Sequence, residues 1–154
     1  MRAGVPLAIV VVLTAACGGG GGDDPGGLPA EPFALGLDEG ECFDRLESPD
    51  VTEVPSVPCD QAHDLEVIAV VALPEGDFPG DDQVVTAATT VCQEEFEGYV
   101  GRPSQDSGLL VVPLPPSRAQ WDGGDRSVVC AAGLVDGQLE ESVRDSEAPP
   151  AAGQ

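Results

Sequence analysis

Apolar residues recur every three or four positions between Asp82 and Val100, and this spacing predicts one amphipathic helix. The members of this stripe are Val84, Val85, Ala88, Val91, Cys92, Phe96 and Tyr99. Asp81 or Asp82 can cap the first turn, because a short carboxylate accepts hydrogen bonds from free backbone N–H groups. Gly101 can end the helix in the left-handed conformation. We therefore expect one long helix that buries a single face.

Four other segments are rich in β-branched residues and lie between prolines and glycines, which is typical of strands. They cover residues 41–46, 65–73, 109–114 and 127–135. The segment 65–73 is almost continuously apolar, so it is expected to be a buried strand although it contains Glu66. Ser117 is expected to cap a short turn through Trp121. The pattern predicts an α+β domain in which one amphipathic helix packs on a small, mainly antiparallel sheet.

Composition divides the chain into a domain and two flanking segments. Residues 17–36 place five consecutive glycines after Cys17 and add further glycine and proline, which is typical of a coil-like linker. Residues 147–154 form a polar, proline-containing tail that we expect to fray. Residues 37–146 remain for one domain, a usual size for a single core. The whole chain has only four Phe, one Tyr and one Trp, so covalent cross-links are expected to support this core.

The first residues have the pattern of an export signal. Arg2 precedes an apolar run from Val5 to Ala16, which is shorter than the roughly 20 residues that span a bilayer. The run ends in Leu13-Thr14-Ala15-Ala16-Cys17, which resembles a bacterial lipobox. The resemblance implies removal of the signal peptide, residues 1–16, and attachment of lipid with acyl chains such as palmitate to the sulfur of Cys17.

Two or more acyl chains hold a protein stably on a membrane. We therefore expect a protein that is lipid-anchored to the extracytoplasmic face of the cell membrane. The alternative is an ordinary secretory signal with an incidental cysteine.

The chain is strongly acidic, with 6 basic residues, 28 acidic residues and a net charge of −22. This charge repels nucleic acid, which we exclude as a partner, and it also repels anionic lipid headgroups. Acid pairs such as Asp81-Asp82 do not have the spacing of a calcium-binding EF-hand loop. We interpret most of the acids as solvated surface charge, and we predict neither a metal site nor a cofactor.

Four cysteines follow Cys17 in the sequence: Cys42, Cys59, Cys92 and Cys130. Outside the cytoplasm, this number in a small domain predicts two disulfides. No C-x-x-C spacing indicates a redox or zinc motif. Four cysteines allow three pairings. We favour Cys42 with Cys59, which would close a proline-rich excursion between two strands, and Cys92 with Cys130, which would join the helix to the sheet.

Two segments carry a family resemblance. The pattern P-C-x-x-x-H-x-x-E-V contains Cys59, His63 and Glu66, and the pattern W-x-x-G-D-R-x-x-x-C contains Trp121, Asp125, Arg126 and Cys130. Together with Gly40-Glu41-Cys42-Phe43 and Phe78-Pro79-Gly80, they follow one another over residues 37–144. This order resembles the septum-formation domain of actinobacterial lipoproteins and membrane proteins. The resemblance implies an extracytoplasmic domain associated with cell division, and it implies no reaction.

The candidate site residues favour structural or binding roles. His63 is the one histidine in the sequence, so a Ser-His-Asp triad would depend on it, and no G-x-S-x-G motif is present. We interpret His63 as a side chain that holds a loop by bonding backbone carbonyls. Asp125-Arg126 is interpreted as an internal ion pair or turn clamp. Trp121 could be a platform on which a ligand stacks or a core anchor, and we favour the anchor because the domain has few aromatic residues. With Glu66, these residues form the candidate set, and we predict no catalytic residue.

These observations favour a non-enzymatic, lipid-anchored domain that binds a division or envelope protein or a cell-wall fragment. The alternative is an envelope hydrolase that uses acidic residues in a groove, since a pair of carboxylates suffices for glycoside hydrolysis. An enzyme predicts a concave site with convergent polar groups. A binding module predicts only a flat patch or an exposed sheet edge.

Overall fold

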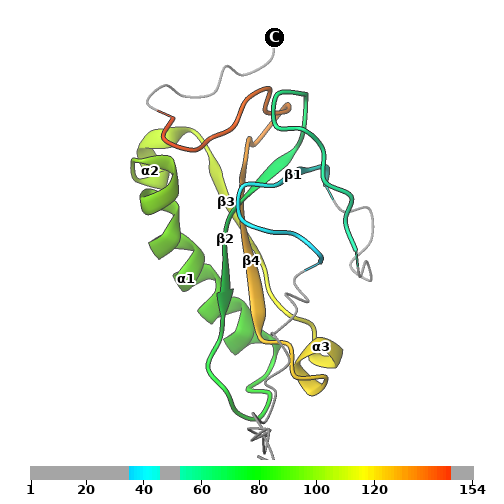
Figure 1. The fold of residues 1–154 in the computed structure, drawn as a ribbon. Helices are drawn as coiled ribbons and strands as arrows, with labels where there is room; N and C mark the ends of the chain where they lie inside the picture. Colours follow the sequence, from blue (N-terminus) through cyan, green and yellow to red (C-terminus); the bar gives the residue numbers. More distant parts are fainter. Residues whose placement is uncertain (1–34, 46–52, 147–154) are drawn as a thin grey trace, which may run out of the picture.

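A computed structural model describes residues 35–45 and 53–146. The predicted signal peptide, Cys17, most of the predicted linker and the predicted tail lie outside these residues. The described strands are β1 (Cys42–Phe43), β2 (Leu65–Ala72), β3 (Leu110–Leu114) and β4 (Ser127–Gly133), and the helices are α1 (Asp81–Val100), α2 (Ser104–Ser107) and α3 (Arg118–Asp122). The strands form one antiparallel sheet in the order β1-β2-β4-β3, beside which α1 runs (Figure 1). The α+β class is therefore confirmed.

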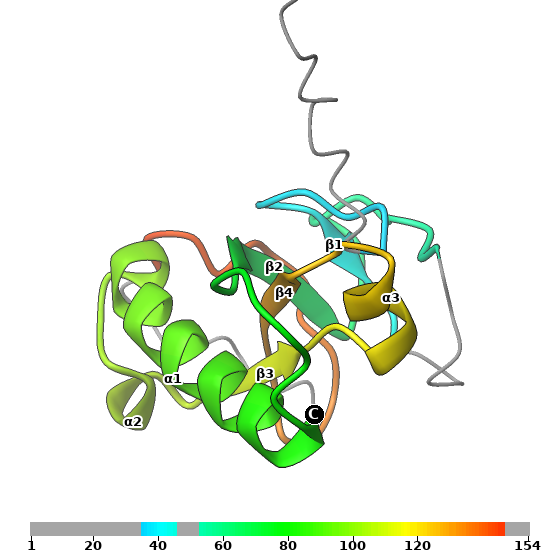
Figure 2. The same ribbon diagram turned by 90° about the horizontal axis from the view of Figure 1, so that it is seen from below.

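The sheet has an apolar layer on each face. Figure 2 shows α1 on one side of the sheet and the segment that precedes β1 on the other. Strand β4 alternates between the two layers: Val128, Cys130 and Ala132 belong to the helix-side core, whereas Val129 and Ala131 pack with Leu37, Phe43 and Val54. Because both faces of the central strands β2 and β4 are covered, these strands are almost continuously apolar.

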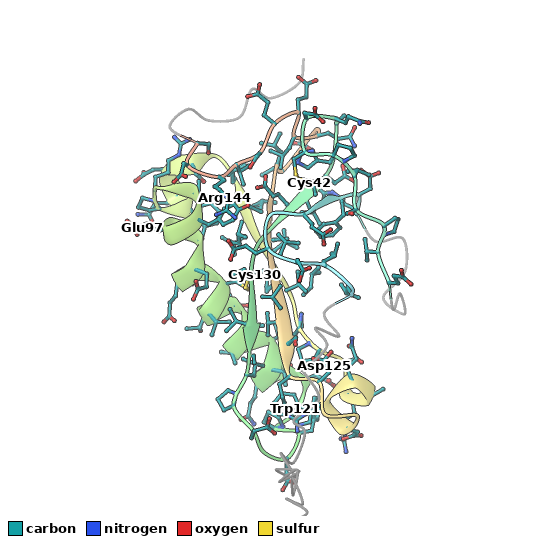
Figure 3. All side chains as sticks on the ribbon, in the orientation of Figure 1. Cys42, Glu97, Trp121, Asp125, Cys130 and Arg144 are labelled. Carbon is teal, nitrogen blue, oxygen red and sulfur yellow. A yellow bond between two sulfur atoms is a disulfide. The ribbon has the colours of Figure 1, made fainter. Side chains whose placement is uncertain are left out.

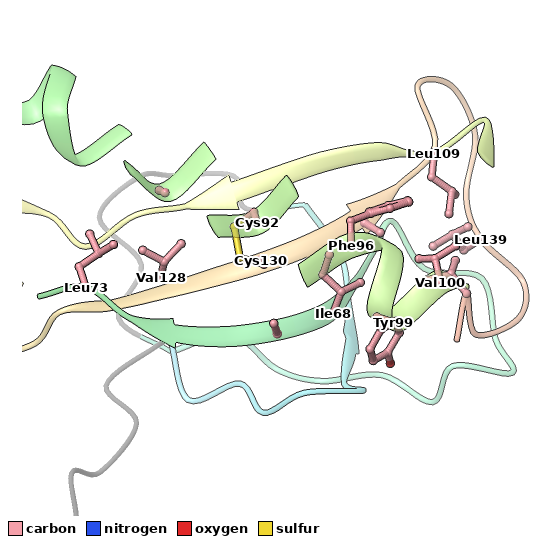
Figure 4. Close-up of a cluster of buried hydrophobic side chains, with 14 of the residues drawn as sticks. Ile68, Leu73, Cys92, Phe96, Tyr99, Val100, Leu109, Val128, Cys130 and Leu139 are labelled. Atoms are coloured by element: carbon pink, nitrogen blue, oxygen red, sulfur yellow. A yellow bond between two sulfur atoms is a disulfide. The ribbon is translucent and has the colours of Figure 1, made fainter. Parts of the chain in front are cut away.

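Strand β2 contains a bulge near Ile68. Val67 pairs with Ala131 and Ala69 pairs with Cys130, so Ile68 has no residue of its own opposite it on β4. An extra residue of this kind lets two consecutive side chains reach the same face. Ile68 and Ala69 accordingly both belong to the helix-side core. Figure 4 shows Ile68 in this core.

Helix α1 begins one residue earlier than expected and is capped differently. The N-cap residue is Gly80, with φ 108°, and its carbonyl accepts hydrogen bonds from the N–H groups of Gln83 and Val84. The prediction that Asp81 or Asp82 caps the helix is therefore wrong, because glycine reaches this backbone conformation and the chain turns into the helix before the acids. Both acids lie in the first turn, where negative charge favours the helix dipole. Gly101 ends the helix in the left-handed conformation, as predicted.

All four strands are shorter than the sequence predicted: β2 ends at Ala72 instead of 73 and β3 begins at Leu110 instead of 109, and β1 and β4 differ more. β1 covers Cys42–Phe43 instead of 41–46, of which residue 46 lies outside the described residues, and β4 ends at Gly133 instead of 135. Arg45 bonds groups at the C-terminal ends of both β1 and β4. Its backbone N–H donates to Asp64 Oδ2 at 2.9 Å, and its guanidinium donates to the Leu134 carbonyl at 2.9 Å. These contacts satisfy groups that would otherwise continue the strands.

Both favoured disulfides are present. Cys42–Cys59 links residues 17 apart in the sequence, and Cys92–Cys130 links residues 38 apart and joins α1 to β4 (Figure 4). Every cysteine in residues 35–45 and 53–146 is therefore oxidised, and none offers a thiolate for zinc binding or nucleophilic attack.

Within the part of the chain that the structure describes, no helix combines the length and apolar character needed to cross a membrane.

Candidate functional site

The residues that the sequence singled out divide between two places in the molecule. Figure 3 shows Cys42 and Arg144 toward one end of the sheet, and Trp121 and Asp125 at the opposite end. Glu66 pairs with Cys42 across the sheet and therefore belongs to the first end. We call Glu66, Tyr99, Ser142 and Val143 the Glu66 centre. We call Phe78, Trp121, Asp125 and Arg126 the Trp121 centre.

The Glu66 centre holds a fully buried carboxylate. Its Oε1 accepts hydrogen bonds from the Tyr99 hydroxyl at 2.6 Å and the Ser142 hydroxyl at 2.7 Å, and its Oε2 accepts one from the Val143 N–H at 2.7 Å. Three donors of this kind offset the loss of water around a charge. Since they come from α1 and from residues 142–143, one side chain ties the sheet, the helix and the C-terminal part of the domain together.

Tyr99 connects this centre to the surface. Burial raises the pKa of Tyr99 well above its ordinary range, and the hydrogen bond to Glu66 raises it further. The Arg144 guanidinium lies 4.1 Å from the centre of the Tyr99 ring and bonds Glu39 at 2.8 Å. The same tyrosine accepts the N–H of Asp145 on its backbone carbonyl. The phenol is therefore a fixed hydrogen-bond donor to Glu66.

His63 is buried and pairs with Leu139, which lies close in the sequence to Ser142 and Val143. Its Nδ1 is 2.7 Å from the Gln61 carbonyl oxygen, a distance at which an Nδ1–H group donates to that oxygen. Its backbone exchanges two hydrogen bonds with Leu139. The imidazole thus holds the turn at 61–63, which is the arrangement that the loop-holding interpretation expects. Among the described residues, nothing bonds Nε2.

The described residues bring one group of potential metal ligands together. One atom each of Cys42, Cys59 and Glu66 lie within 4.8 Å of one another. The two sulfurs are joined in a disulfide, and both Glu66 oxygens accept hydrogen bonds. This donor set does not fit a metal ion, because a disulfide sulfur is not a thiolate.

The Trp121 centre is held by α3 and by residues 74–79, which we call the 74–79 loop. Ser117 and Gln120 form a capping box at the start of α3, as the expected cap at Ser117 requires. The Trp121 indole N–H donates to the Gly76 carbonyl at 3.0 Å, and Arg126 Nη2 donates to the same oxygen at 3.2 Å. One carbonyl therefore fixes the loop to both α3 and the start of β4.

Asp125 and Arg126 act as a turn clamp. Asp125 Oδ1 accepts the Ser127 N–H at 2.8 Å, and Arg126 donates to the carbonyls of Trp121 and Gly76. Among the ion pairs of the described residues, Arg126 pairs with Glu75 at 3.8 Å and not with Asp125. Of the two interpretations that the sequence allowed, the geometry shows the turn clamp.

Trp121 is enclosed by other side chains. Its exposed fraction is 5%. The Arg126 guanidinium lies over its ring at 4.2 Å from the centroid, and the Phe78 ring meets it edge-on at 5.7 Å. A ring covered in this way anchors the core and does not offer a face for stacking on a ligand.

Three cavities surround the 74–79 loop. The apolar one has a volume of about 240 Å³ and is lined chiefly by Leu73, Pro74, Pro79, Val84, Ala87 and Trp121. A polar one of about 380 Å³ is lined by Gly76, Asp77, Phe78, Arg118, Trp121, Asp122 and Arg126. A third, of about 240 Å³, lies at the start of α1 beside Asp81 and Asp82. These three cavities and one of the two motif segments therefore meet at this end of the molecule.

The exposed sheet edge at β3 is less suited to binding a partner strand than the cavities are to binding a side chain. β3 pairs with β4 on one side and contains Pro113. Proline has no N–H, so it is tolerated on an edge strand whose nitrogen side faces outward. The missing donor also weakens pairing with an added strand.

The comparison with known families decides the identity of the domain. A family model described as "septum formation" matches residues 34–130, which is more than half of the chain. The chain belongs to the septum-formation family. No curated protein and no solved structure matches it.

Membership in the septum-formation family links the chain to septum formation in cell division. The match contains Glu66 and the whole Trp121 centre, and it ends at Cys130. Ser142 and Val143, which donate to Glu66, lie beyond it. The septum-formation domain of this chain thus extends structurally through residues that follow the matched range.

Sequence reasoning missed the partners of both centres. Glu66 is an isolated acid in an apolar strand, and Tyr99 is the polar end of the helix stripe, so their pairing had a weak signal. Ser142 and Val143 lie in an acidic segment that nothing marks. The Gly76 carbonyl gives no side-chain signal at all.

Proposed function

We propose that this septum-formation domain is held on the extracytoplasmic face of the cell membrane by lipid on Cys17 and binds a partner of the division machinery or envelope. The lipobox-like sequence at residues 13–17 supports the anchor. The observation that carries the binding role is the set of cavities around the 74–79 loop, beside Trp121 and Arg126.

A concave site with convergent polar groups is the feature expected of an enzyme. The cavity lined by Leu73, Pro74 and Val84 offers mainly apolar contact instead, and the Trp121 and Arg126 side chains beside it donate to backbone carbonyls. This supports binding of an apolar group more than it supports a reaction.

We propose binding without catalysis. The buried polar side chains Glu66, His63 and Asp125 each bond to backbone or side-chain groups that hold the fold. Glu66 and His63 lie at the end of the sheet away from the Trp121 cavities. The groups that would serve most readily as a general acid or base are thus committed to structural contacts.

One observation favours the alternative, an envelope hydrolase. Asp77 and Asp122 both line the polar cavity, and two carboxylates are the usual requirement for glycoside hydrolysis. Asp122 is bonded to Arg118 at 3.0 Å. If the protein is a hydrolase, purified protein releases soluble fragments from a cell-wall preparation, and Asp77→Asn or Asp122→Asn abolishes the release. A binding domain leaves the preparation intact.

Lipid attachment is tested by metabolic labelling with a clickable fatty acid. Cys17→Ala removes the sulfur that forms the thioether, so the variant should carry no label and should leave the membrane fraction. Ala16→Gly keeps a small residue before the cysteine and serves as the control that retains the label. Equal labelling of wild type and Cys17→Ala would contradict the proposed anchor.

A further inference from the structure

We propose that the apolar cavity beside the 74–79 loop, called here the groove, receives a segment of a partner protein in which an apolar side chain is flanked by lysine or arginine. The inference rests on the proposed binding function and names the chemistry of its partner. It follows from the groove's lining, its charged rim and the fixed position of its loop.

The groove is shaped for an apolar side chain. Leu73, Val84 and Trp121 are buried residues that contribute to its lining, and Pro74 and Pro79 line it as exposed residues. The next residue on α1, Val85, is 49% exposed. Transfer of an apolar side chain from water onto such a surface is favourable.

The rim of the groove is anionic. Glu75 and Asp77 line it, and Asp81 and Asp82 border the adjoining cavity. Glu75 has 89% of its side chain exposed, and its nearest cation, Arg126, also bonds the Trp121 and Gly76 carbonyls. Basic residues on either side of an apolar anchor would therefore meet carboxylates that are open to them.

The chemistry of the chain disfavours other occupants. A second copy carries the same net charge of −22 and is repelled, as are nucleic acid and anionic lipid. A sugar ring would need an open aromatic face, and the Trp121 ring is covered by Arg126 and Phe78. A basic polypeptide is attracted at long range and then meets an apolar contact.

The groove is preformed in the described structure. The Gly76 carbonyl accepts hydrogen bonds from both Trp121 and Arg126, which fix the wall formed by the loop. A wall that is already ordered reduces the entropy lost on binding. The loop therefore does not have to fold when the partner arrives.

The test measures peptide binding to full-length lipidated protein in nanodiscs of zwitterionic lipid by fluorescence anisotropy. The probe is a labelled peptide with one leucine between two pairs of lysines, compared with its Leu→Ser and its Lys→Glu counterparts. We expect the first peptide to bind and each counterpart to bind about tenfold more weakly or not at all. Equal binding of the Leu→Ser peptide would overturn the proposal, because the apolar anchor would then contribute nothing.

Two variants locate the binding site. Ala87→Phe fills the groove, and Glu75→Lys/Asp77→Lys reverses charge on an exposed loop without touching the core. Each should weaken binding about tenfold. The matched control, Glu94→Lys/Glu95→Lys, makes the same change in net charge at exposed positions farther along α1 and should leave binding nearly unchanged. Thermal melts show which variants remain folded, and the loop variant suffices if Ala87→Phe does not.

Equal weakening by the control and loop variants would overturn the proposal, since it would show attraction to the overall charge alone. A self-associated protein in sedimentation whose dimer is broken by Ala87→Phe would assign the groove to a second copy and also overturn it. If the peptides fail to bind but the wild-type protein localises to the septum in cells and the groove variants do not, the partner chemistry is wrong and the proposed function stands. If the peptides fail and the groove variants localise like the wild-type protein, both the proposed partner chemistry and the proposed function are contradicted.

Discussion

At the scale of single residues, Glu66 shows how a charge can be part of a core. An ionised carboxylate that is buried alone is strongly destabilising. Here three donors, one from α1 and two from residues 142–143, bond its two oxygens. The carboxylate holds these three donors in place by hydrogen bonds, and these bonds tie the C-terminal part of the domain to β2.

The variant Glu66→Gln should destabilise the domain by roughly 3 kcal/mol. The amide keeps one acceptor oxygen but places an NH₂ group against either the Val143 N–H or the two hydroxyl donors. Urea unfolding measures the loss. The control, Glu94→Gln, changes an exposed residue of α1 and should leave stability nearly unchanged. Equal stability of both variants and wild type would show that the Glu66 centre does not support the fold.

Tyr99 should make the free energy of unfolding decrease at alkaline pH. Its folded-state pKa is raised by burial and by Glu66, whereas the unfolded chain ionises near its ordinary value of about 10. The stabilisation is therefore complete below about pH 10 and falls as pH rises above it, because only the unfolded state loses the proton. The chain has one tyrosine, so phenolate absorbance reports this group alone.

In that titration, phenolate should appear together with unfolding. Tyr99→Phe removes the signal and should also remove this contribution to the alkaline loss of stability. Ionisation of Tyr99 in the folded protein near pH 10 would contradict the assignment of the phenol as a fixed donor to Glu66.

At the scale of elements, long patterned segments could be predicted and short ones could not. α1 could be predicted from the three-to-four spacing of its apolar residues, and β2 and β4 from their almost continuous apolar runs. α2 was not predicted, and all four strands were overestimated, β1 and β4 the most. The C-terminal ends of β1 and β4 involve Arg45, which bonds Asp64 and Leu134, residues distant from it in the sequence. The start of α1 depends on the backbone of Gly80, which side-chain patterns do not show.

The two disulfides should differ in their contribution to stability. The loop-entropy relation gives about 3 kcal/mol for Cys42–Cys59 and about 4 kcal/mol for Cys92–Cys130, because the linked cysteines are 17 and 38 residues apart in the sequence. Double substitution to alanine should follow this order in urea unfolding. Replacing Cys92 and Cys130 by alanine also leaves a cavity between α1 and β4, because both cysteine side chains are buried. A larger loss for Cys42→Ala/Cys59→Ala would contradict the placement of the helix-to-sheet bridge at the core.

At the scale of the whole molecule, the two ends of the sheet have different characters. The end that contains Glu66 is closed by hydrogen bonds to the C-terminal residues, and the end that contains Trp121 is hollowed by cavities. The sequence placed His63, Glu66, Trp121, Asp125 and Arg126 in one candidate set. Their separation into two centres could not be predicted, because it depends on which end of β2 and β4 each residue reaches.

The most direct test of the binding surface is site-specific photocrosslinking in dividing cells. A photoreactive residue replaces Glu75 at the rim of the groove or, as the control, Glu95 on the exposed face of α1. Our account predicts that the Glu75 probe captures a discrete envelope or division protein at the septum, that Cys17→Ala abolishes the capture, and that the Glu95 probe captures little. Equal capture by both probes, or capture by the Glu95 probe alone, would contradict the assignment of binding to the Trp121 end.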